Sequence, residues 1–85
     1  LASSPYIKVV GSGDITININ NQKLVLKGVE GYIEVDTELY NCFKDNINQN
    51  NKMYSDFPIF EEGINNISWE GNASQLEILP RWVVL

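Results

Sequence analysis

The amino-acid sequence predicts an all-β fold, an antiparallel sandwich or small barrel of about seven or eight short strands. Three observations favour this class. Short runs rich in β-branched residues recur along the chain, turn-forming residues separate them roughly every eight to twelve residues, and no segment has a convincing helical period. Strict alternation of apolar and polar residues in some runs indicates a sheet with one buried face and one face in water.

The first part of the chain divides into strands and turns of this kind. Residues 6–10 and 15–19 predict two strands, and the Gly-Ser-Gly-Asp run at 11–14 predicts a hairpin between them. In 15–19, isoleucine alternates with polar residues, which indicates a half-buried strand. The asparagine pair at 20–21 then predicts a tight hairpin into a strand at 23–27, because asparagine accepts the left-handed backbone that such a turn requires.

The middle of the sequence is less regular. A turn at 28–31 precedes a predicted strand at 32–36, in which Ile33 and Val35 face inward. Residues 37–43 fit both a short helix and a strand, and we interpret them as a strand.

Asparagine and proline mark the segments that follow. Residues 45–52 have no periodic apolar face, which predicts an exposed loop. Residues 56–60 are typical of an extended edge segment, because Pro58 cannot donate a ladder hydrogen bond. A turn is expected at 61–63.

The last part of the chain predicts two further strands, at 65–69 and 74–79, joined by a tight turn at 70–72. Pro80 then restricts residues 81–84 to the edge of a sheet.

Composition and charge exclude several classes of function. The 85 residues, 44% hydrophobic and 20% charged, suit one globular domain that spans residues 1–85. A formal net charge of −5 has the wrong sign for nucleic-acid binding, and no apolar run is long enough to span a membrane. Without histidine, the chain lacks the usual base of hydrolases and the commonest metal ligand. We therefore expect no enzyme activity and no cofactor or metal.

Cys42 is the only cysteine, so neither a disulfide within the chain nor a cysteine-based zinc site can form. With no histidine to activate it, we interpret it as a buried structural thiol. The chain opens with Leu1, and its first residues lack the pattern of a signal peptide. We interpret the sequence as a piece of a longer protein.

Three carboxylates, Glu34, Asp36 and Glu38, are spaced two residues apart and would share one face of a strand. A hard cation or a glycosidase can use such an arrangement. A solvated strand face is the simpler interpretation, because no neighbouring residue suggests the buried carboxyl group that a glycosidase needs.

The aromatic residues allow a second kind of site. Trp69 and Trp82, together with Tyr32, Tyr40 and Tyr54, could line a platform for a sugar. In so small a domain, packing in the core or at its rim is the more ordinary role of two tryptophans. The candidate contacts for a glycan or a protein partner are Tyr32, Glu34, Asp36, Trp69 and Trp82.

Short motifs follow one another in a definite order along the chain. They are Asp36-Thr37-Glu38-Leu39, Asn51-Lys52-Met53, Asp56-Phe57-Pro58, Gly63-Ile64-Asn65-Asn66-Ile67-Ser68-Trp69 and Ile78-Leu79-Pro80-Arg81-Trp82, preceded by Gly11-Ser12-Gly13-Asp14-Ile15-Thr16 and Gly31-Tyr32-Ile33. In this order they resemble the carboxy-terminal domain of the distal tail proteins of siphophages and prophages of Gram-positive bacteria. The resemblance covers most of the chain. It departs at residues 61–63, which lack the proline often found there, and at Val83, which replaces a basic residue.

The resemblance implies a galectin-like, jelly-roll-like β-sandwich. It also implies a preceding domain, absent from this chain, that builds a hexameric ring at the tip of the phage tail. The partners would be other tail and baseplate proteins, and the location would be the tail tip of a virion assembled in the bacterial cytoplasm. The family offers no catalytic residue to carry over. Among the motif residues, we expect Arg81 to pair with Glu77 or Glu70.

The sequence therefore predicts a structural, non-enzymatic module of a phage tail tip that is monomeric as an isolated domain. The alternative is a carbohydrate-binding module that contacts cell-wall glycans through its aromatic residues. An enzyme that acts on wall polymers through the carboxylates at 34, 36 and 38 is the third hypothesis.

Overall fold

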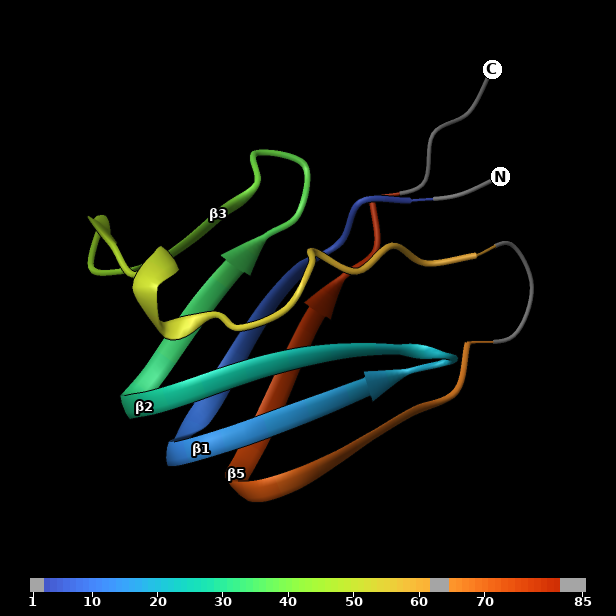
Figure 1. Ribbon diagram of the computed structural model, residues 1–85. Coiled ribbons are helices and arrows are strands. Elements are labelled where there is room, and N and C mark those ends of the chain that lie inside the picture. The colour runs from blue at the N-terminus through green and yellow to red at the C-terminus, as the bar shows by residue number, and fades with distance from the viewer. Residues whose placement is uncertain (1–2, 62–64, 82–85) are drawn as a thin grey trace.

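The computed structural model describes residues 3–61 and 65–81 and shows an all-β fold, as predicted (Figure 1). Its elements are β1 (Tyr6–Ile19), β2 (Gln22–Asp36), β3 (Asn41–Lys44), β4 (Ile47–Asn48), the short 3-10 helix η1 (Asn50–Lys52) and β5 (Ile67–Leu79). The five strands form one sheet in the order β4-β3-β2-β1-β5, and every neighbouring pair is antiparallel.

Three of the turns predicted from the sequence are bends inside long strands. The segments at 11–14, 28–31 and 70–72 lie within β1, β2 and β5, and pairing continues on both sides of each bend. The pairing register shifts at the bends, so the turn-forming residues produce irregular, bulge-like positions and do not reverse the chain. The described residues consequently form five strands where we expected about seven or eight.

The bends fold the sheet over itself. In Figure 1, one half of each long strand lies toward the right of the view and the other half toward the top, and the two halves meet at the lower left. Alternate side chains from both halves enclose the core, and burial of this apolar surface is the main stabilising force. The buried apolar residues are Ile7, Val9, Ile15, Ile17, Ile19, Leu24, Leu26, Val29, Ile33, Val35, Cys42 and Phe60.

The hairpin predicted at the asparagine pair is confirmed. Ile19 pairs with Gln22, which leaves a two-residue loop between β1 and β2. Asn20 has a φ of 54°, the left-handed conformation for which asparagine is suited.

The strand predicted over residues 37–43 is only partly correct, because residues 37–40 form a turn and β3 begins at Asn41. The Asp36 carboxylate explains the turn: its Oδ1 accepts hydrogen bonds from the backbone N–H of Glu38 (3.1 Å) and Leu39 (3.2 Å). The buried Thr37 hydroxyl donates to the carbonyl oxygen of Pro5 at 2.8 Å.

Residues 53–60 lie along the first half of β2, mostly without regular ladder pairing. Met53 forms a single bridge with Leu26, and the Gln22 side chain bonds both the N–H and the C=O of Ile59, at 2.9 and 2.7 Å. This agrees with the extended edge segment predicted at 56–60. The loop predicted at 45–52 is largely exposed, although it contains β4 and η1. The turn predicted at 61–63 and the edge segment predicted at 81–84 fall almost entirely outside the described residues.

The bends of β5 and β1 approach each other closely at Gly71. Its φ is +104°, and a Cβ atom added there would lie 2.3 Å from the carbonyl oxygen of Asp14. Any other residue would therefore collide with the backbone of β1 and strain its own backbone as well.

Gly71→Ala is expected to lower the free energy of unfolding by roughly 3 kcal/mol or more, because the collision adds to the backbone strain. Gly13→Ala is the matched control, since Gly13 also has a positive φ (+78°) but a Cβ there meets nothing within 4 Å. That variant is expected to lose only about 1 kcal/mol. Urea unfolding of both variants measures the difference, and equal losses would contradict the close approach at Gly71.

Candidate functional site

The most strongly organised charged group is an ion pair between Asp36, at the end of β2, and Arg81, just after β5. One guanidinium nitrogen of Arg81 lies 2.7 Å from Oδ1 of Asp36 and the other 3.2 Å from Oδ2. Nε donates to the carbonyl oxygen of Ser4 at 2.9 Å and lies 3.7 Å from the Glu38 carboxylate. The pair therefore joins three segments that are far apart in the sequence.

The predicted partners of Arg81 are wrong. We expected Glu77 or Glu70, but Arg81 has a φ of 53° beyond the end of β5, and its side chain binds Asp36 on β2. Glu77 faces Lys8 instead, with 4.0 Å between the ammonium nitrogen and a carboxylate oxygen.

Asp36 is held in its charged form. Hydrogen bonds from Arg81, together with those from the backbone N–H of Leu39 and Glu38, lower the pKa of the Asp36 carboxyl group against the opposing effect of burial. A glycosidase acid needs a raised pKa, so Asp36 is unsuited to that role. Glu38 lies in the turn and not on β2, so the three carboxylates do not share one strand face as the sequence suggested.

Tyr32 and Glu34 belong to a polar network on the outer face of β1 and β2. Tyr6 donates its hydroxyl hydrogen to Glu34 at 2.5 Å, and burial, followed by this bond, raises the pKa of Tyr6. The Tyr32 hydroxyl donates to Asp45 on the β3–β4 turn. The ammonium groups of Lys8 and Lys44 lie 4.9 and 5.0 Å from the centre of the Tyr32 ring. The Tyr32 ring therefore already makes cation–π contacts with two lysine side chains of the same chain.

The aromatic residues do not form one platform. Trp69 pairs in register with the buried Ile17, so it lies on the core-facing side of the sheet, whereas Tyr32 lies on the outer face. Trp69 is 48% exposed, so of the two ordinary roles expected for it, packing inside the core is ruled out. The reason is its position on β5, an edge strand. Trp82, the other candidate aromatic, lies outside the described residues.

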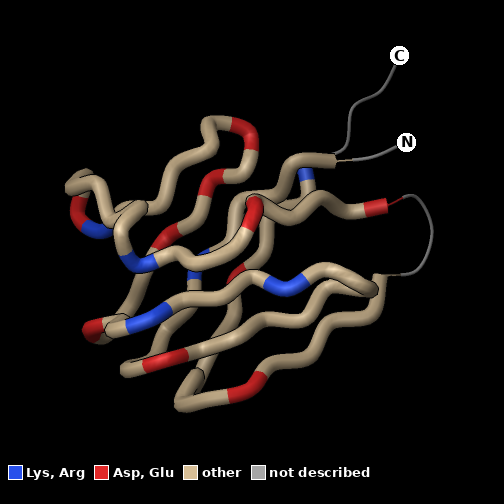
Figure 2. Tube along the Cα trace, in the orientation of Figure 1, with Lys and Arg blue, Asp and Glu red and all other residues tan. Residues whose placement is uncertain are grey.

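Charged residues are distributed over the whole fold and do not gather on one strand (Figure 2). Among residues 3–61 and 65–81, no three Cys, Asp or Glu side chains are grouped so as to hold a metal ion. The same residues include no helix of the length and apolar character that a membrane crossing needs.

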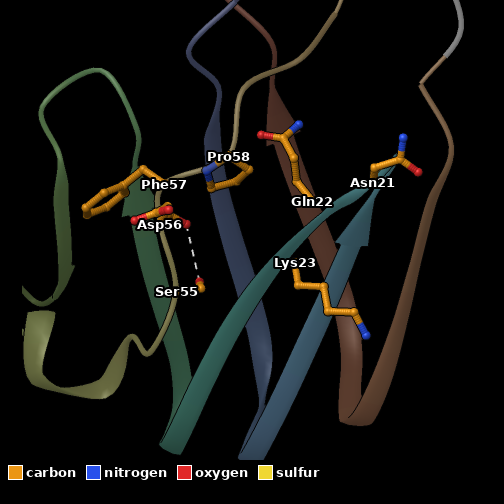
Figure 3. A pocket seen from close by; sticks show the side chains of 7 residues that line it. All are labelled: Asn21, Gln22, Lys23, Ser55, Asp56, Phe57 and Pro58. Atoms are coloured by element: carbon orange, nitrogen blue, oxygen red, sulfur yellow. Dashed lines mark hydrogen bonds between the residues drawn. The ribbon is translucent and has the colours of Figure 1, made fainter.

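A pocket of about 440 Å³ lies between the start of β2 and the segment after η1. Its lining residues are Asn21, Gln22, Lys23, Ser55, Asp56, Phe57 and Pro58 (Figure 3). Figure 3 shows the Phe57 and Asn21 side chains at opposite ends of this group, and the end of the Lys23 side chain directed away from Asp56. Its polar groups therefore do not converge on one point. Sequence reasoning missed the pocket because its two segments meet only in the folded chain.

Cys42 is fully buried, as predicted, and burial raises the pKa of its thiol to about 11. A thiol that remains protonated at neutral pH is a poor nucleophile, so its role is to fill space in the core.

Comparison of this chain with models of protein families, with curated proteins and with solved structures gave no match.

The Asp36–Arg81 pair predicts how stability depends on pH. The folded-state pKa of Asp36 lies below its unfolded value, so the stabilisation is complete above roughly pH 4 and is lost as the pH falls through the folded-state pKa. Asp36→Asn is expected to lower the free energy of unfolding by roughly 1–2 kcal/mol at pH 7 and to flatten this acid limb.

The matched control is Asp56→Asn, which changes an exposed aspartate in the same way. Unfolding in urea at a series of pH values measures both variants. An acid limb as steep in Asp36→Asn as in the unmodified chain would show that the ion pair does not stabilise the fold.

Proposed function

We propose that this chain is a structural, non-enzymatic module of a phage or prophage tail tip, the carboxy-terminal domain of a distal tail protein. The proposal rests on the ordered motifs described above. The observation that supports it most is that residues from separate motifs contact one another in the fold, as Asp36 and Arg81 do.

The motif residues take part in contacts that close the fold. Asp36, in the motif at residues 36–39, pairs with Arg81, in the motif at residues 78–82, at 2.7 Å. Asn20 of the β1–β2 hairpin donates to the Asn65 side chain and accepts from the backbone N–H of Asn66, both at 2.9 Å. These contacts join distant parts of the chain and so maintain the fold. A role in maintaining the fold is what we expect of motif residues in a structural, non-enzymatic module.

The proposal includes the galectin-like β-sandwich that the resemblance implies. Its support is the folded-over sheet, in which β1, β2 and β5 each contribute to both halves around one core. In the proposed assembly, a preceding ring-forming domain supplies the hexamer, and this module projects from the ring toward other baseplate proteins.

The test is to find the chain in virus particles. Antibodies raised against the purified 85-residue chain are applied to tailed particles released by the strain that encodes it, and gold-labelled antibody is viewed by electron microscopy. The expected label lies at the tail tip, and preincubation of the antibody with the folded chain should remove it. Purified particles without peptides of this chain in mass spectrometry would overturn the proposal.

A carbohydrate-binding module remains the second candidate, because Trp69 presents 48% of its surface to solvent. This alternative predicts that purified wall polysaccharide binds the chain and that Trp69→Ala abolishes binding while the protein stays folded. Ile47→Ala is the control, since Ile47 is 63% exposed and lies on β4, at the opposite end of the strand order from β5. Calorimetric titration without any heat of binding would exclude this candidate.

A further inference from the structure

The two edges of the folded sheet differ in how far other segments of the chain cover their backbone groups. Beside β2, residues 34–36 pair with β3, and the first half of the strand is covered by residues 53–60. On the opposite side, β5 pairs with β1 through its inner edge, and no strand in the described part of the chain pairs with its other edge. β5 thus offers unpaired backbone groups along 13 residues.

The apolar side chains on the core-facing side of β5 are incompletely covered. This β5 apolar row consists of Ile67, Trp69, Leu76 and Ile78. Their register partners on β1, Ile19, Ile17, Val9 and Ile7, are all fully buried. Trp69 remains 48% exposed, and the other three members of the row are only partly buried. A further strand beside β5 would bury the row and satisfy the free edge at the same time.

The outer face indicates the charge of such a strand. Glu34 on β2, Lys8 on β1 and Glu77 on β5 occupy one row across the sheet, so the charge alternates from strand to strand. Lys8 lies 4.0 Å from Glu77. The next position in the row, beside Glu77, would be complementary if it carried a positive charge. Glu70 adds a second negative charge on β5, which has no lysine or arginine (Figure 2).

We propose that the free edge of β5 binds an extended segment of another protein, with apolar residues facing the β5 apolar row and lysine or arginine at the alternate positions. A second copy of this chain fits poorly, because its β5 supplies only Glu70 and Glu77 as charges and each copy has a net charge of −5. This inference rests on the proposed function, since it names the chemistry of the partner that an assembly module would bind.

The experiment uses the purified 85-residue chain and a short soluble peptide in which valine and lysine alternate. Amide hydrogen exchange, followed residue by residue by NMR, is expected to slow at the β5 amides that point away from β1. The same peptide with glutamate in place of lysine is expected to bind about fivefold to tenfold more weakly, since each cross-strand charge contact changes from attraction to repulsion. A peptide N-methylated at every residue, which has no N–H group left on either edge, should give no protection.

Charge reversal on the protein gives an independent check. The double variant Glu70→Lys/Glu77→Lys, which reverses both charges of β5, is expected to reverse the preference, so that the valine–glutamate peptide binds more tightly than the valine–lysine peptide. Glu30→Lys is the matched control, because the Glu30 side chain is 81% exposed and lies on β2, away from the β5 edge. That variant should keep the original preference.

Three results would overturn the inference: no protection of β5 by the valine–lysine peptide, equal binding of both peptides, or self-association of the chain through β5 in sedimentation and exchange. The experiment involves no virus particles, so its failure is distinct from the absence of the chain at a tail tip. If the valine–lysine peptide binds at β5 but antibodies do not label the tail tips of virus particles, the tail-tip assignment is refuted and the proposed binding at the free edge of β5 still stands.

Discussion

The whole fold depends on three bends that occur at the same level of neighbouring strands. β1, β2 and β5 each change direction near their glycine-containing segments while they remain paired, so one sheet supplies both walls of the core. Gly71 is where this constraint is tightest, because β5 passes within contact distance of the Asp14 carbonyl group. Two walls from one sheet suit a short chain, since 85 residues give little material for separate layers.

Local patterns predicted the parts of the fold that local residues determine. Alternation in 15–19 identified a buried face, and the asparagine pair at 20–21 identified the hairpin between β1 and β2. The segments at 11–14, 28–31 and 70–72 have the composition of hairpin turns but form bends. A turn and a bulge draw on the same residues, and the choice between them depends on which strands pair, a non-local property.

Less of the candidate site could be predicted from the sequence, because its contacts also depend on which distant segments meet in the fold. Spacing along β2 placed Glu34 on the outer face, but the partner of Arg81 is Asp36, 45 residues away in the sequence. Nothing local distinguishes Asp36 from the glutamates nearer to Arg81. The exposure of Trp69 likewise follows from the place of β5 in the strand order, which no period along the chain encodes.

The Asp36–Arg81 pair and the free edge of β5 have complementary consequences. The pair fixes the end of β5 against β2 and the amino-terminal segment, so the edge strand is held at its last residues while its outer side stays open. Glu70 and Glu77 on that strand oppose pairing with a second acidic copy, which is a common protection of exposed edges. The same charges would favour a basic strand. An acidic edge strand repels the same strand of a second copy and would attract a basic strand, so it can stay unpaired until it meets a basic partner. That property would suit a component that is added to a larger assembly.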